Sequence, residues 1–92
     1  MKLTIGPSVA KTYYETGYSA YQNEQYADAI LNFSKAVEYD PTNVEALYNL
    51  GNAYRKNENT DDAIKTYELL LELFPTSSRA SKAKNFISSL SN

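Results

Sequence analysis

Apolar residues recur three and four positions apart in five stretches of the chain, and this spacing is typical of amphipathic helices. The stretches are separated by a proline or by polar segments, such as QNEQ at 22–25 and KNENT at 56–60. The pattern predicts an all-α fold. Its helices are expected over residues 9–22, 26–39, 44–56, 61–74 and 78–90.

Residues suited to helix ends lie between these stretches. Pro41 and Pro75 are expected to end the second and fourth helices, because a proline disfavours helical geometry in the residue before it. Thr42 and Glu45 have the spacing of a capping box, which predicts that Thr42 caps the third helix. The fourth and fifth helices also follow good capping residues: Asn59 or Thr60, and Ser77 or Ser78.

The chain repeats itself with a period of 34 residues. Ten positions match without a gap: Tyr14/Tyr48, Gly17/Gly51, Asn23/Asn57, Glu24/Glu58, Asp28/Asp62, Ala29/Ala63, Ile30/Ile64, Glu38/Glu72, Pro41/Pro75 and Thr42/Thr76. A fixed period of this size indicates stacked repeats, each of which is one supersecondary unit. Here each unit is a pair of helices.

Gly17 and Gly51 interrupt the first and third helices at equivalent positions. An interior glycine destabilises a helix by about 1 kcal/mol relative to alanine. Its recurrence therefore indicates a packing reason. Each glycine lies twelve residues before an alanine, Ala29 or Ala63. We expect these small residues to let the two backbones of each helix pair approach closely.

At these residues the chain resembles the tetratricopeptide repeat (TPR) family, whose pattern is W-x2-L-G-x2-Y, then A-x3-F, A and P over 34 residues. In the second unit the corresponding residues are Leu47, Leu50, Gly51, Tyr54, Ala63, Tyr67, Leu70 and Pro75. In the first they are Tyr13, Thr16, Gly17, Ala20, Ala29, Phe33, Ala36 and Pro41. The departures are Thr16 for leucine, Ala20 for tyrosine and Leu70 for alanine.

The resemblance implies an α-α superhelical solenoid of two helix-turn-helix units, residues 10–43 and 44–77. Residues 1–9 are then an N-terminal extension or linker. Residues 78–92 form a fifth, capping helix, whose outer face is polar as a solenoid end requires.

Composition removes several classes of chemistry. The chain has no cysteine and no histidine, and so lacks the thiolate nucleophile and the commonest general base and metal ligand. No paired carboxylates, glycine-rich phosphate loop or metal-ligand cluster stands out in the sequence. We expect a protein that is not an enzyme and that needs no cofactor and no metal.

The net charge of −2 is distributed unevenly. Residues 1–72 carry all eleven acidic side chains and six basic ones, whereas residues 73–92 carry three basic side chains and no acidic one. This acidic body, with a sequence pI of about 5.0, disfavours nucleic acid as a partner. No apolar run predicts membrane insertion, and the N-terminus lacks the apolar core of a signal peptide. A cytoplasmic location is favoured, with a fragment of an exported or membrane-tethered protein left open.

The resemblance also implies that the first helix of each unit lines a concave groove, and helical spacing assigns side chains to that face. The predicted peptide-binding residues are Tyr14, Tyr18, Tyr21, Tyr48, Asn49, Asn52, Arg55, Arg79 and Lys82. The four tyrosines are expected to be open to solvent, as on many protein-binding surfaces. The alternative is that they pack on one another and shield a small core. Core positions are expected for Tyr13, Tyr26, Phe33, Tyr39, Tyr54 and Tyr67.

Some members of the family bind acidic chaperone tails through a clamp of lysines, asparagines and an arginine. Here Asn49 and Arg79 fit two of the five clamp positions, whereas Tyr14, Tyr18 and Ala83 occupy the other three. That specialised role is therefore not favoured. The predicted function is a protein–protein interaction module for a peptide or protein segment. The alternative is structural self-association, as a homodimer or by stacking.

Overall fold

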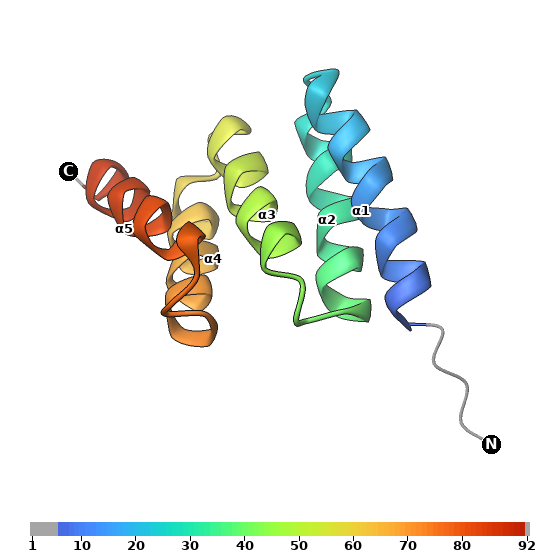
Figure 1. Cartoon of the computed structure of the whole chain (residues 1–92). Helices are drawn as coiled ribbons and strands as arrows, with labels where there is room; N and C mark the ends of the chain where they lie inside the picture. The colour runs from blue at the N-terminus through green and yellow to red at the C-terminus, as the bar shows by residue number, and fades with distance from the viewer. Residues whose placement is uncertain (1–5, 92) are drawn as a thin grey trace.

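The computed structural model describes residues 6–91 and confirms an all-α fold (Figure 1). The helices are α1 (Gly6–Gln22), α2 (Tyr26–Tyr39), α3 (Val44–Lys56), α4 (Thr60–Leu73) and α5 (Ser78–Leu90). They follow one another along a row, with α1 at one end and α5 at the other (Figure 1). None of these helices combines the length and the apolar character that crossing a bilayer requires.

Helix contacts give the row its curvature. Each helix packs mainly against its neighbours in the chain, and α3 also approaches both α1 and α5. By contrast, α2 and α4 make no close contact within residues 6–91. The first helices of the units are therefore closer together than the second helices. The row forms a short solenoid that bends toward the side of α1, α3 and α5.

The helix bounds agree with the sequence-based expectation to within one residue, except at the start of α1. This helix begins at Gly6 rather than at residue 9. Pro7 fits there because a proline in the first turn removes an N–H that has no intrahelical partner. Part of the expected N-terminal extension is therefore helical. Residues 1–5 lie outside the described residues.

The cap of α3 differs from the expectation. Asn43, not Thr42, is the N-cap, and its side chain accepts a hydrogen bond of 3.1 Å from the backbone N–H of Ala46. Thr42 is instead held by the carboxylate of Asp40, which accepts from both its hydroxyl and its backbone N–H. The Thr42–Glu45 capping box was therefore wrong.

The other two caps fall within the expected choices. Ser77 caps α5, where its hydroxyl accepts from the N–H of Arg79. Asn59 occupies the N-cap position of α4 but makes no side-chain cap bond. Its side chain accepts from Asn57 instead.

Two clusters of buried residues form the core. Each cluster lies within one unit and extends to the helix that follows that unit. The largest fully buried side chains are Phe33 in α2 and Tyr67 and Leu70 in α4. Leu50 and Ala53 of α3 pack with the Phe33 cluster, so the second unit helps to bury the first. Ala80 and Ala83 of α5 pack with the Tyr67 cluster. The fifth helix therefore closes the core of the second unit.

The recurring glycines make room for aromatic rings. A Cβ at Gly17 would stand 2.8 Å from Cδ1 of Phe33, and one at Gly51 would stand 2.6 Å from Cε1 of Tyr67. Real Cβ atoms essentially never come so close to another atom. The expected packing reason is confirmed, but each glycine yields space to a ring sixteen residues on in the sequence. The atoms nearest to each missing Cβ belong to the ring and not to the alanine.

One expected core aromatic is wrong. Tyr39, the last residue of α2, is 45% exposed and stacks on Tyr13 of α1 with ring centroids 5.8 Å apart. Its equivalent in the second unit, Leu73, also lies at a helix end and is exposed. Among the described helices, none buries this position in either unit. Tyr13, Tyr26 and Tyr54 are only half-buried.

The turn inside each unit has the same backbone form. Glu24 and Glu58 lie one period apart, with φ of 59° and 65°. This left-handed region is uncommon for residues other than glycine. Its recurrence means that the period is preserved in backbone geometry as well as in sequence.

Candidate interaction face

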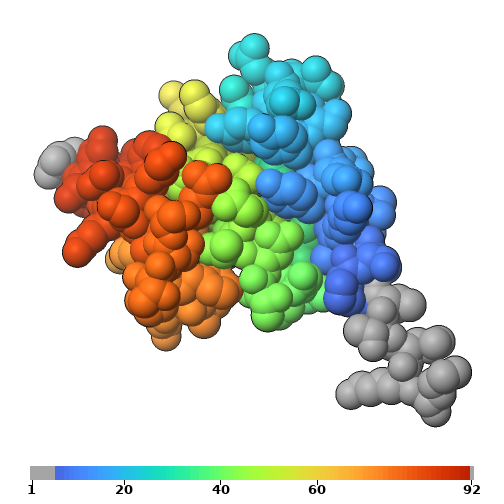
Figure 2. Space-filling model, in the orientation of Figure 1, coloured from blue at the N-terminus to red at the C-terminus, as the bar shows by residue number. Residues whose placement is uncertain are grey.

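Nine predicted residues lie on α1, α3 and α5, the three helices of the concave side. We call this surface the three-helix face: Tyr14, Tyr18, Tyr21, Tyr48, Asn49, Asn52, Arg55, Arg79 and Lys82. Figure 2 shows part of α1 in blue, α3 in green and α5 in red on the surface of the molecule. Because α3 contacts both other helices, its side chains form the floor of the face, with α1 and α5 on either side.

The α1 side is a wall of tyrosines. The rings of Tyr14 and Tyr18 are stacked with centroids 6.3 Å apart. The rings of Tyr14 and Tyr21 also pack near the buried ring of Phe33, with centroids 5.7 Å and 6.5 Å from the Phe33 centroid. Tyr14 and Tyr21 are half-buried, while Tyr18 is 43% exposed. Phe33 therefore supports this wall from the core side, and Tyr18 is its exposed ring.

Tyr48 does not have the expected exposure. It is 8% exposed, and its ring packs 6.3 Å from the ring of Tyr67. The guanidinium carbon of Arg79 lies 4.8 Å from the centre of the Tyr48 ring. The fifth helix therefore covers Tyr48, and the alternative of a shielding tyrosine holds at this position. Asn52 is buried as well.

A chain of hydrogen bonds crosses the floor. Asn49 Nδ2 donates to the hydroxyl of Tyr14 over 3.0 Å, and Asn52 Nδ2 donates to Asn49 Oδ1 over 3.4 Å. The Tyr67 hydroxyl donates to Asn52 Oδ1 over 2.5 Å and accepts from Arg55 Nε over 3.3 Å. Every link joins two side chains, and the chain runs from α1 through α3 to α4.

The two arginines of the face differ in their partners. Arg79 donates from Nε and Nη2 to the two carboxylate oxygens of Glu45, at 2.7 Å and 3.0 Å. Arg55 lies over the ring of Phe86, with its guanidinium carbon 4.2 Å from the centroid. Lys82, one turn beyond Arg79, is exposed. Cationic groups therefore line the α5 side of the face.

Sequence reasoning missed the ion pair between Glu45 and Arg79. Glu45 and Arg79 are one period apart, so they occupy the same position in successive units. Opposite charges at one repeat position on adjacent helices were a usable signal. It also missed the Tyr67 hydroxyl, because a core position does not show what its polar tip meets.

The ionisation of the face follows from these contacts. Burial raises the pKa of Tyr14, and the charge of Glu45 raises it further. Burial also raises the pKa of Tyr21 and of Tyr67, although the hydrogen bond from Arg55 partly opposes the shift of Tyr67. The hydrogen bonds to Glu45 raise the pKa of Arg79. Near neutral pH Tyr14 and Tyr21 therefore keep their hydroxyl protons, and the guanidinium of Arg79 stays charged.

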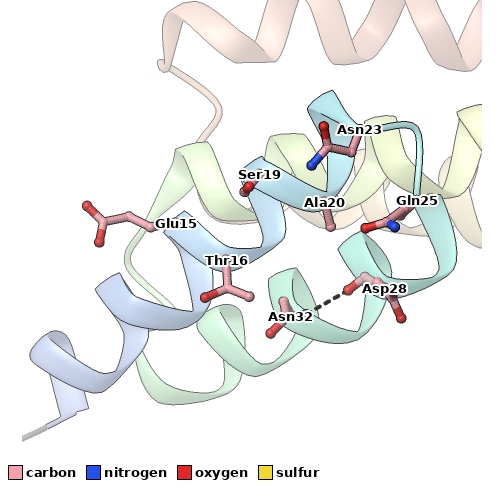
Figure 3. Close-up of a pocket in the computed structure, with 8 residues that line it drawn as sticks. All are labelled: Glu15, Thr16, Ser19, Ala20, Asn23, Gln25, Asp28 and Asn32. Carbon is pink, nitrogen blue, oxygen red and sulfur yellow. Dashed lines mark hydrogen bonds between the residues drawn. The ribbon is translucent and has the colours of Figure 1, made fainter.

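Two shallow depressions lie away from this face. One, of about 490 Å³, lies between α1 and α2 and is lined by Glu15, Thr16, Ser19, Ala20, Asn23, Gln25, Asp28 and Asn32 (Figure 3). Asn32 Nδ2 donates to the backbone carbonyl of Asp28, while Glu15 points away from the other side chains (Figure 3). The other, of about 510 Å³, includes Leu71, Pro75 and Lys84. Among residues 6–91, no group of three acidic side chains gathers as a metal ion would require.

Comparison with known proteins identifies the repeat. A family model described as tetratricopeptide repeat matches residues 14–78. The chain belongs to the tetratricopeptide repeat family. The resemblance drawn from the sequence is therefore confirmed. Repeats of this family generally mediate protein–protein interactions, and the TPR fold is typically non-catalytic.

No curated protein sequence matches the chain. Among solved structures, the Arabidopsis OM64 TPR domain is similar, with 16% sequence identity and a TM-score of 0.48. The match covers 91% of this chain and 98% of that one.

Proposed function

We propose that this TPR protein is a non-catalytic interaction module that binds a peptide or protein segment across the three-helix face. Its repeat units are residues 10–43 and 44–77. The observation that carries the proposal is the open ring of Tyr18, held in place by Tyr14 on a wall of aromatic residues. A large aromatic side chain that is rigid and exposed is a favourable anchor for a protein partner.

The residues of the face have different proposed roles. Tyr14, Tyr18 and Tyr21 contact apolar side chains of the ligand, and Asn49 and the hydroxyl of Tyr14 meet its polar groups. Tyr48 and Asn52 are too buried for wide contact and support the floor from beneath. Arg55, Arg79 and Lys82 supply the positive charge. In this arrangement rigid rings give affinity and the hydrogen-bonding groups give orientation.

Tyr18→Ala tests the proposal. A display library of random short peptides is selected on the wild-type chain, and the affinity of the best-enriched peptide is then measured for each variant. Tyr18→Ala should weaken binding about tenfold or more, because a central aromatic anchor contributes strongly. The matched control is Tyr39→Ala, an equally exposed tyrosine on α2, which should leave affinity unchanged. Equal losses in both variants would contradict binding at the three-helix face.

A second candidate function is self-association. Leu69 and Leu73, one turn apart on α4, are 40% and 50% exposed. Exposed apolar pairs of this kind favour contact with another surface. Light scattering over a wide concentration range distinguishes the two candidates. A concentration-dependent dimer that Leu73→Lys abolishes would favour self-association, whereas a monomer throughout would exclude it.

A further inference from the structure

Arg55 and Arg79 are held in similar ways on the three-helix face. Each guanidinium lies over an aromatic ring, Phe86 for Arg55 and Tyr48 for Arg79. Stacking of this kind fixes the plane of the guanidinium and leaves its edge available for hydrogen bonding. The two arginines thus present similar forks, one on α3 and one on α5.

Within residues 6–91, only one of these forks is paired with a carboxylate. Arg79 holds both oxygens of Glu45. Arg55 donates through Nε to the neutral hydroxyl of Tyr67, and in the part of the chain that the structure describes it forms no ion pair. Its two terminal nitrogens make no hydrogen bond to residues 6–91. A guanidinium fork is best matched by a carboxylate, which accepts two parallel hydrogen bonds.

The charges of the two helix layers also favour an acidic ligand. In α1, α3 and α5 there are six basic and two acidic side chains, a net charge of +4. In α2 and α4 there are two basic and six acidic side chains, a net charge of −4. The concave layer is therefore positive and the opposite layer negative. Lys84 lines a depression away from the three-helix face, but on the face itself Arg55, Arg79 and Lys82 are cationic, and Glu45 pairs with only one of them. Charge of one sign on a recognition face selects partners of the other sign.

We propose that Arg55 is a receptor for a carboxylate of the ligand, and that the segment bound at the three-helix face is acidic. This inference rests on the proposed function. The carboxylate of the ligand pairs with Arg55 in the same way that Glu45 pairs with Arg79. An apolar or aromatic side chain of the same segment contacts Tyr18, on the α1 side of the face.

An acidic protein segment fits these charges better than a nucleic acid. A polyphosphate backbone is bound through many cations at once. Here one of the cations, Arg79, already has a carboxylate partner, and the whole chain carries a net charge of −2. A single acidic side chain needs only one well-oriented fork.

The test uses the best-enriched peptide from the random display library and the same peptide with its acidic residues changed to Gln or Asn. Enriched peptides should be acidic, and the neutral version should bind about ten- to a hundredfold more weakly. Arg55→Gln should cause a similar loss, and combining it with the neutral peptide should add little, because the two changes remove one interaction. Arg55→Lys should recover part of the affinity.

Controls separate the possible outcomes. Lys65→Gln removes a positive charge from the negative layer and should leave peptide affinity unchanged. Because the neutral peptide leaves the protein intact, the test stands even if Arg55→Gln impairs folding. Peptides that depend on Tyr18 but show no preference for acids would overturn this inference and leave the proposed function standing. Peptides that do not depend on Tyr18 would contradict both. A single-stranded oligouridine probe that binds, and is lost in Arg55→Gln, would overturn the acidic segment in favour of RNA.

Discussion

Gly51 of α3 lies directly beneath the ring of Tyr67 of α4, at a distance that leaves no room for a Cβ atom. Tyr67 is fully buried, and its hydroxyl is tied to Asn52, the residue after the glycine. Moving the ring away from Gly51 would therefore strain this hydrogen bond. This contact explains why a helix-destabilising residue occupies the middle of α3.

Gly51→Ala should destabilise the protein. Alanine favours the helix by about 1 kcal/mol, but its Cβ forces the Tyr67 ring out of position, and overpacking of a core typically costs about 1–3 kcal/mol. The net free energy of unfolding, measured in urea, is therefore expected to fall. Ser88→Ala, at an exposed site in α5, is the control and should leave stability unchanged or slightly higher. A Gly51→Ala protein more stable than the wild type would rule out the ring contact.

Tyr67→Phe should also destabilise the protein, by about 1–3 kcal/mol, because it leaves the buried side chain of Asn52 without its donor. The first unit offers the reciprocal change. Phe33 stands at the equivalent position, and Tyr18 and Tyr21 stand where the second unit has Asn52 and Arg55. Phe33→Tyr should therefore bring no stabilisation. If Tyr67→Phe unfolds at the same urea concentration as the wild type, the hydrogen-bond chain contributes nothing to stability.

Two tyrosines of the three-helix face should respond differently to truncation. Tyr48→Ala removes a buried ring and should cost roughly 3–5 kcal/mol. Tyr18→Ala removes an exposed ring and should cost less than about 1 kcal/mol. Thermal and urea unfolding of both variants check the difference. Comparable losses would mean that Tyr18 belongs to the core.

Stability should decline at alkaline pH. Burial raises the pKa of Tyr67 in the folded state above the ordinary value of 10.0. Below pH 10 the hydroxyl of Tyr67 keeps its proton in both the folded and the unfolded state. The contribution of this buried hydroxyl to the free energy of unfolding is therefore fully present there. Above it the unfolded chain loses the proton first, and the free energy of unfolding falls until the folded pKa is passed. Tyr67→Phe lacks this group, so its free energy of unfolding should fall less steeply above pH 10 than that of the wild type. Parallel slopes would contradict the shift.

The helices could be predicted because their signals are local. Apolar spacing, prolines and the period of 34 residues fixed the helix pairs, and the same glycines carried the family resemblance. The cap of α3 could not be predicted, because Thr42 and Asn43 are both good capping residues. The choice depends on Asp40, whose carboxylate holds Thr42 and leaves Asn43 to cap.

The residues of the three-helix face could be predicted from the sequence, but the solvent exposure of each side chain could not. Tyr48 lies on the correct side of α3, but its burial depends on Arg79, which comes from another helix. Tyr39 shows the opposite error, since a core position in the repeat is exposed where no helix follows over it. A helical pattern gives the direction of a side chain, whereas its burial depends on neighbours that are distant in the sequence.

The order of the helices has a consequence for how the molecule opens. Each helix leans on its chain neighbours, and α1 and α5 make no contact with each other within the described residues. In such an array, local unfolding begins most easily at the ends. Amide hydrogens should therefore exchange faster in α1 and α5 than in α3.

A segment lying across the three-helix face would contact both α1 and α5, which make no contact with each other within the described residues. Binding should then slow exchange in α1 and α5 far more than in α3, so that the ends become as protected as the middle.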